Sequence, residues 1–164
     1  MTHLRLSLCL SLLMPTFVAA QAHPEFATVG DWTVRSNPAN GNGCYMEKTF
    51  ESGTLVQIGV VPDQNGAFFA AYNAAFGGVV DGEAGSVLFD FGDSRFQGDA
   101  VGAHFAGLPG GYAFFDNPEF ASEFGKRTSV LVQGGSGETE DLDLSGSMKG
   151  LHSIKACRAQ FEES

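Results

Sequence analysis

The chain has 164 residues, of which 19 are Asp or Glu and 9 are Lys or Arg, so its formal net charge is −10. This acidic balance argues against nucleic acid and anionic lipid as partners, because each phosphate contact calls for a lysine or an arginine. The length fits one domain with a single hydrophobic core.

The first 22 residues have the pattern of a secretory signal peptide. Arg5 supplies the positive head, and residues 6–18 form an apolar stretch that is shorter than the roughly 20 residues needed to span a bilayer. The small residues that follow fit a cut after Ala20 or after Ala22. The sequence therefore predicts export to the periplasm or secretion, and residues 23–164 then form one mature domain without a transmembrane segment.

Alternating apolar residues and frequent turn residues predict a series of short strands. In the first of them, Trp32 and Val34 share one face. The pair Asn65-Gly66 is a hairpin signal. We expect strands at residues 31–35, 44–50, 54–61, 67–72, 86–91, 95–97, 101–105, 112–115, 129–133 and 142–144.

Two segments have helical patterns. Residues 118–126 follow a possible cap at Asp116 or Asn117, and Phe120 and Phe124 lie four residues apart on one face. Residues 147–162 form the second helix. Its cap is Ser145 or Ser147, and its apolar face is Met148, Leu151, Ile154 or Lys155, and Arg158, with Cys157 and Phe161 nearby. The predicted fold class is α+β and mostly β: an antiparallel sheet or sandwich of short strands, with one short helix and a C-terminal helix packed on it.

Cysteine usage predicts one disulfide. Cys9 would leave with the signal peptide, so Cys44 and Cys157 remain as an even pair in an exported protein. Neither cysteine has the C-x-x-C spacing of a redox site. The loop closed by this bond would stabilise the fold by on the order of 4–5 kcal/mol in the chain-entropy model.

A short N-terminal motif resembles a known family. The motif is Gly30-Asp31-Trp32-Thr33-Val34-Arg35, followed by Cys44-Tyr45-Met46-Glu47. It resembles the start of the invasion-associated locus B family of small exported alphaproteobacterial proteins, and Leu142-Asp143-Leu144-Ser145-Gly146 before the last helix is also similar. Ser36 stands where that family usually has its first cysteine, so Cys157 would be a different partner for Cys44. The resemblance implies a periplasmic or envelope-associated β domain and no particular catalytic residues.

No motif specifies a reaction. The segment Gly134-Gly135-Ser136-Gly137-Glu138 lacks the last glycine of a serine-hydrolase elbow. The histidines of the mature chain, His23, His104 and His152, are not spaced as metal ligands on a helix face. We therefore predict a protein that is not an enzyme and has no metal or other cofactor.

Two groups of acidic residues are interpreted as parts of solvated loops, and a functional role is the alternative for each. They are Asp90, Asp93 and Asp99, and then Glu138, Glu140, Asp141 and Asp143. Neither group fits the EF-hand spacing, so a weak calcium site is only an alternative. Asp90 and Asp93 are also the candidates for an acid–base pair.

The aromatic residues provide the candidate binding patch: Phe68, Phe69, Tyr72, Phe76, Tyr112, Phe114 and Phe115. Adjacent strand residues face opposite sides, so Phe68-Phe69 and Phe114-Phe115 cannot all enter one core unless both sheet faces are covered. The leading hypothesis is a non-enzymatic envelope domain that binds a protein or cell-surface partner. The alternative is a binder of a small apolar ligand in a Phe-lined pocket, and a distant third is an unrecognised hydrolase.

Overall fold

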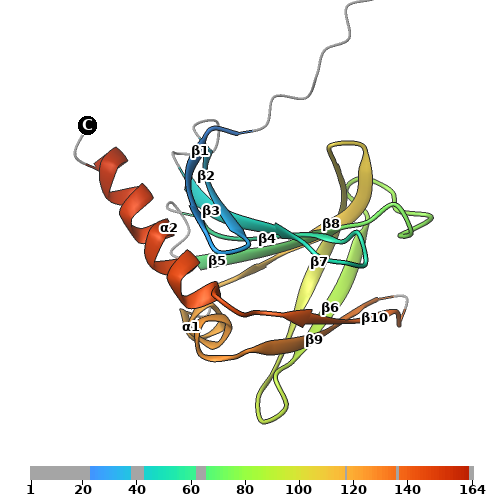
Figure 1. Ribbon diagram of the computed structural model, residues 1–164. Coiled ribbons are helices and arrows are strands. Elements are labelled where there is room, and N and C mark those ends of the chain that lie inside the picture. The colour runs from blue at the N-terminus through green and yellow to red at the C-terminus, as the bar shows by residue number, and fades with distance from the viewer. Residues whose placement is uncertain (1–22, 38–42, 62–65, 117, 136, 163–164) are drawn as a thin grey trace, which may run out of the picture.

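The computed structural model describes residues 23–37, 43–61, 66–116, 118–135 and 137–162 (Figure 1). These residues form a mostly β structure, as predicted, and none of their helices is long and apolar enough to cross a membrane. The elements are β1 (Glu25–Val29), β2 (Trp32–Asn37), β3 (Gly43–Thr49), β4 (Leu55–Val61), β5 (Gly66–Tyr72), β6 (Ala84–Asp90), β7 (Arg95–Phe105), β8 (Leu108–Phe115), α1 (Pro118–Lys126), β9 (Ser129–Gly134), β10 (Thr139–Asp143) and α2 (Ser147–Glu162).

All ten strands belong to one antiparallel sheet with the order β1-β2-β3-β4-β5-β8-β7-β6-β9-β10. Most neighbours are also neighbours in sequence, and the exceptions are the pairs β5–β8 and β6–β9. The prediction of an antiparallel sheet is therefore confirmed, as a single sheet.

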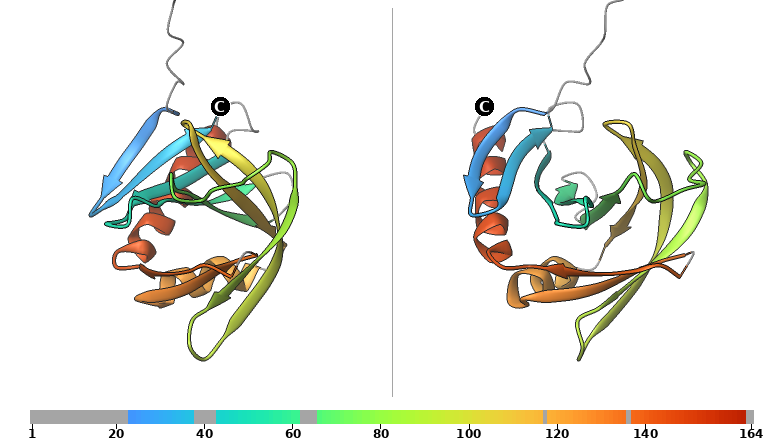
Figure 2. Two further views of the ribbon diagram at one scale, coloured as in Figure 1. Left: turned by 90° about the vertical axis from the view of Figure 1, so that its right-hand side faces the viewer. Right: turned by 45° about the vertical axis from the view of Figure 1, so that its right-hand side comes forward.

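The sheet curls strongly, so its two ends approach each other (Figure 2). Lys48 on β3 lies 3.5 Å from the carboxylate of Asp143 on β10. Next to this contact, the Thr54 hydroxyl donates a hydrogen bond of 2.7 Å to Glu140 on β10. These contacts hold the β3–β4 turn against the last strand, and the sheet encloses an interior.

One part of this interior is filled by phenylalanine rings from the sheet and from α1. Phe89 on β6 is fully buried, and its ring contacts the rings of Phe69, Phe115, Phe120 and Phe124 at centroid distances between 4.7 and 6.0 Å. Edge-to-face pairs of this kind add about 0.5–1.5 kcal/mol each beyond the burial of their area. The predicted pair Phe120 and Phe124 thus anchors α1 to the sheet.

The C-terminal helix α2 packs on β1, β2 and β3 and also contacts α1 (Figure 1). Trp32 is fully buried, and its indole nitrogen donates a hydrogen bond of 3.0 Å to the carbonyl of Ser145, just before the helix. The Ser147 hydroxyl donates to the carbonyl of Phe124, so it joins the start of α2 to α1 and does not cap α2.

The buried face of α2 differs in part from the predicted one. Ile154 and Cys157 are buried, and Leu151 packs at the edge of the core. Met148 is 42% exposed and Lys155 is exposed, because the face that meets β2 and β3 is centred on Cys157. The apolar periodicity therefore predicted the position of the helix in the sequence correctly. It predicted the wrong side of the helix, in part, as the buried one.

The predicted disulfide is confirmed between Cys44 on β3 and Cys157 on α2, whose Cα atoms are 6.2 Å apart. Both cysteines are buried in the main hydrophobic cluster. The bond therefore fastens the last helix to the N-terminal half of the sheet.

Several strand boundaries differ from the predicted ones. The strand expected at 112–115 begins earlier, at Leu108, as β8. Strand β1 has no counterpart among the predicted strands. The separate strands expected at 95–97 and 101–105 are one continuous strand, β7, and the strand expected at 142–144 is the end of the longer β10. The signal peptide, the loop at 38–42, most of the 62–66 hairpin and the Asn117 cap lie outside the described residues.

Replacing both cysteines by alanine (Cys44→Ala with Cys157→Ala) should lower the free energy of unfolding by about 2–5 kcal/mol, because the unfolded chain is no longer closed into a loop. Urea unfolding of the chain from residue 23 onward measures this difference. Dithiothreitol should destabilise the wild type similarly and leave the variant unchanged. Two free thiols in the unreduced protein, counted by alkylation and mass measurement, would contradict the assignment.

Candidate functional site

The part of the sheet interior that the phenylalanine rings leave unfilled is a half-open cavity of about 960 Å³. Its walls come from β5 to β10, from residues 73–83 between β5 and β6, and from Ser52 and Thr54 near the start of β4. None of the described lining residues belongs to either helix. Phe69 lines the cavity, and its ring also contacts the ring of Phe124 on α1. It therefore lies at the boundary between the cavity and the core that the helices cover.

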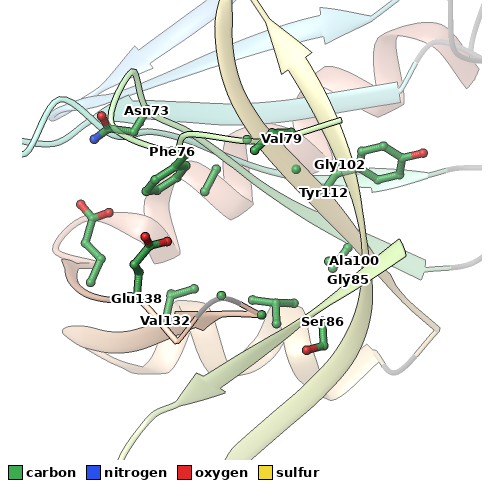
Figure 3. Close-up of a pocket in the computed structure, with 18 of the residues that line it drawn as sticks. Asn73, Phe76, Val79, Gly85, Ser86, Ala100, Gly102, Tyr112, Val132 and Glu138 are labelled. Carbon is green, nitrogen blue, oxygen red and sulfur yellow. The ribbon is translucent and has the colours of Figure 1, made fainter. Parts of the chain in front are cut away.

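Small side chains on adjacent strands create the space. Along one row of the sheet, Phe69 on β5 is followed by Ala113 on β8, Ala100 on β7 and Gly85 on β6. All four residues line the cavity, which Figure 3 shows from the side of β6 and β7. Because three of the four carry at most a methyl group, this part of the interior is not packed by the protein itself.

The segment from Asn73 to Glu83 lies along one side of the cavity. The C-terminal end of this segment is held to β7 by two backbone hydrogen bonds. The amide of Gly82 donates to the carbonyl of Gly102, and the amide of Gly102 donates to the carbonyl of Glu83. A Cβ on Gly102 would lie 2.3 Å from the carbonyl oxygen of Val80, so only glycine permits this close approach. The ring of Phe76 points from this segment into the cavity (Figure 3).

The other end of the segment is held by Asn73. Its side-chain nitrogen donates to the hydroxyl of Thr54 at 2.8 Å and to the carbonyl of Ser52 at 3.1 Å. Thr54 is buried and donates in turn to Glu140, which also accepts a hydrogen bond from the hydroxyl of Ser52. This network fixes the orientation of the Glu140 carboxylate at the edge of the cavity.

The polar groups of the cavity are acidic or neutral. Glu83, Glu138 and Glu140 line it, and no lysine, arginine or histidine is among its described lining residues. Glu138 and Phe76 extend into the space from opposite sides (Figure 3). The rest of the lining is dominated by apolar side chains and by glycine, so the site combines an apolar body with a negative rim.

The structure divides the seven aromatic residues of the predicted patch between two sheet faces. Phe69 and Phe76 line the cavity, and Phe115 belongs to the buried ring cluster. Tyr112 contributes to the lining, is 44% exposed, and directs its ring away from the cavity (Figure 3). The remaining members, Phe68, Tyr72 and Phe114, lie on the opposite face of the sheet.

On that opposite face the aromatic residues form a second group. Phe68 and Phe114 are Cα partners across β5 and β8, and Phe68 also contacts the ring of Tyr45 at 6.3 Å. Tyr72 packs against Phe105 at 5.4 Å, and burial raises the pKa of its phenol to about 12. Burial and the nearby Glu47 carboxylate raise the pKa of Tyr45 as well. Both phenols are therefore neutral at physiological pH.

The carboxylates proposed for acid–base work are engaged elsewhere. Asp90 accepts hydrogen bonds from the Gly92 amide and from Arg95, which lower the pKa of its carboxyl group. Asp93 forms an ion pair with Arg127. Both lie near the β6–β7 turn, and neither lines the cavity, so the structure does not support this pair as a catalytic couple.

A metal site has no support in the described part of the chain, where no group of three or more His, Cys, Asp or Glu residues converges. Nδ1 of His104 lies 2.7 Å from the carboxylate of Asp81. Ser136 of the glycine-rich turn lies outside the described residues.

Comparison with known proteins gives a likeness at the level of the fold. No protein-family model matches the sequence, and no curated protein matches it either. Among solved structures, the chain is similar to the crystal structure of invasion associated protein B from Bartonella henselae, with a TM-score of 0.54 over 81% of this chain and 97% of that chain. The sequence identity is 11%, so the likeness concerns the fold alone. This chain therefore has a fold like that of invasion associated protein B, which agrees with the family that its N-terminal motif resembles.

Proposed function

We propose that this chain is an exported, non-enzymatic domain that binds a small, largely apolar molecule in the cavity of the curled sheet. The observation that carries the proposal is the row of Ala113, Ala100 and Gly85 beside Phe69, whose small side chains help to form the half-open cavity of about 960 Å³. Ligand sites typically have volumes of about 300–1,000 Å³ and mostly apolar walls with few polar groups. The buried disulfide supports the exported location, because such bonds persist in oxidising compartments.

The aromatic residues also bear on the choice between the two leading hypotheses. A partner-binding patch would need Phe69 and Phe115 on an exposed surface, and they are only 3% and 7% exposed. Phe69 instead forms part of the cavity wall. This placement favours the ligand hypothesis over a single patch made of all seven residues.

Binding of the neutral apolar dye Nile red tests the proposal. The exported form should bind the dye saturably, with an increase and a blue shift of its fluorescence. Gly85→Phe should abolish this signal, because a Cβ on Gly85 meets only the carbonyl of Ala100, at 3.9 Å, and the added ring would therefore occupy the cavity.

Two further variants keep this experiment interpretable. Gly85→Ala adds one methyl group in the same place and should retain most of the binding, whereas Ala100→Phe fills the cavity from the neighbouring strand and should abolish it. Circular dichroism and thermal unfolding establish that each variant is folded. A folded Gly85→Phe variant that binds Nile red like the wild type would refute the proposal.

A second candidate function is recognition of an envelope protein through the opposite sheet face. It is favoured by Phe68 and Phe114, which are half-buried Cα partners on the face opposite to the buried ring cluster, and by the exposed residue Tyr112.

Capture of envelope proteins by the immobilised exported form, identified by mass spectrometry, tests this second function. A specific partner should be lost with Tyr112→Ser and retained with Leu131→Ser, because Leu131 is similarly exposed, at 42% against 44%, on a different strand. Equal capture by both variants would count against this face as the contact surface.

A further inference from the structure

The polar rim of the cavity has a single sign of charge. Glu83, Glu138 and Glu140 contribute carboxylates, and the described lining residues include no basic side chain to neutralise an anionic ligand. The head group of a ligand that fills the apolar part would lie among these carboxylates. A fatty acid or another anionic amphiphile would therefore be repelled at the position where its head must rest.

The carboxylates also differ in their exposure to solvent. Glu140 is oriented by the hydroxyls of Ser52 and Thr54, so it is a fixed part of the wall. Glu83 and Glu138 are exposed residues that both line the cavity, Glu83 on the segment before β6 and Glu138 on the segment before β10. They are therefore the two solvent-facing carboxylates of the lining, and they belong to two separate segments of the chain.

An aromatic ring completes this arrangement. Phe76 points into the same space as Glu138 (Figure 3). The face of an aromatic ring attracts cations and in particular ammonium groups, and neighbouring carboxylates add to this attraction. At the inner end, Phe69, Val87 and Val132 offer apolar surface to a hydrocarbon chain.

We propose, on the basis of the ligand-binding function above, that the natural ligand is a cationic amphiphile. Its hydrocarbon part lies against Phe69, Val87 and Val132, and its ammonium head lies between Glu83 and Glu138 beside Phe76. Glu140 supplies a third negative charge from the wall and keeps anionic molecules of the same shape out.

Three probes with the same ten-carbon chain test the choice of head group. Decylamine, which is protonated at neutral pH like a lysine side chain, should displace Nile red at lower concentration than the neutral 1-decanol. Decanoate should be the weakest of the three. The expected advantage of decylamine over decanol is about tenfold, from on the order of threefold for each of the two carboxylates at the opening. Raising the salt concentration should reduce this advantage and leave decanol unaffected.

A matched pair of variants separates the rim from the general attraction of cations to a protein of net charge −10. Glu83→Gln with Glu138→Gln should remove most of the advantage of decylamine and leave decanol binding unchanged. The control, Asp31→Asn with Asp116→Asn, removes two negative charges at exposed residues outside the cavity lining and should preserve the advantage.

The outcomes distinguish this inference from the function on which it rests. Saturable decanol binding without preference for decylamine, or an equal loss of preference in both double variants, would overturn the cationic head group and leave the apolar cavity in place. Failure of all three probes and of Nile red would overturn the proposed function itself.

Discussion

The packing of rings around Phe89 is the interaction on which the rest of the structure depends. This ring joins residues of β5, β6, β8 and α1 in one buried cluster, and so it fixes where the short helix meets the curled sheet. The cluster fills one part of the interior only. Beyond Phe69 the neighbouring strands β8, β7 and β6 carry alanine and glycine in the same row. The curvature that brings the rings together elsewhere forms the half-open cavity here. The same curved sheet therefore forms both the core and the cavity. Large side chains fill the interior in the core, and small side chains leave it open in the cavity.

Much of the fold was predictable from local patterns. Both helices agree with the predicted ranges because each contains apolar residues spaced near the helical period, although the buried face of α2 differs in part from the predicted one. The disulfide followed from the two cysteines that remain once the predicted signal peptide is set aside. Strand β7 was predicted as two pieces because Gly98 interrupts its apolar pattern. In the fold that glycine faces the Phe115 ring, which would lie 2.8 Å from a Cβ, so the reason for it lies on another strand.

The cavity left almost no local signal. Much of its wall on β6, β7 and β8 is glycine and alanine, which in a sequence resemble turns or weak strands. These residues form one wall only because β5, β8, β7 and β6 are neighbours in the sheet. The aromatic patch was a visible signal, but alternation along each strand sends Phe68 and Phe114 to one face and Phe69 and Phe115 to the other.

The neighbour of Ser36 across the sheet was also not predictable from the sequence. Ser36 lies directly opposite Cys44 in the β2–β3 register, a relation that the sequence alone does not reveal. The position where the resembled family usually has a cysteine is thus next to the cysteine that here bonds to α2.

The docking of α2 on β1, β2 and β3 has a consequence for the order of events in biogenesis. Trp32, Val34 and Met46 are synthesised early, yet the helix that covers this end of the sheet follows all ten described strands in the sequence. A polypeptide that emerges from the ribosome N-terminus first exposes these side chains until α2 has been synthesised. The N-terminal half of the sheet therefore cannot bury this apolar surface as an independent unit, and its completion is coupled to synthesis of a helix more than 100 residues further along the chain.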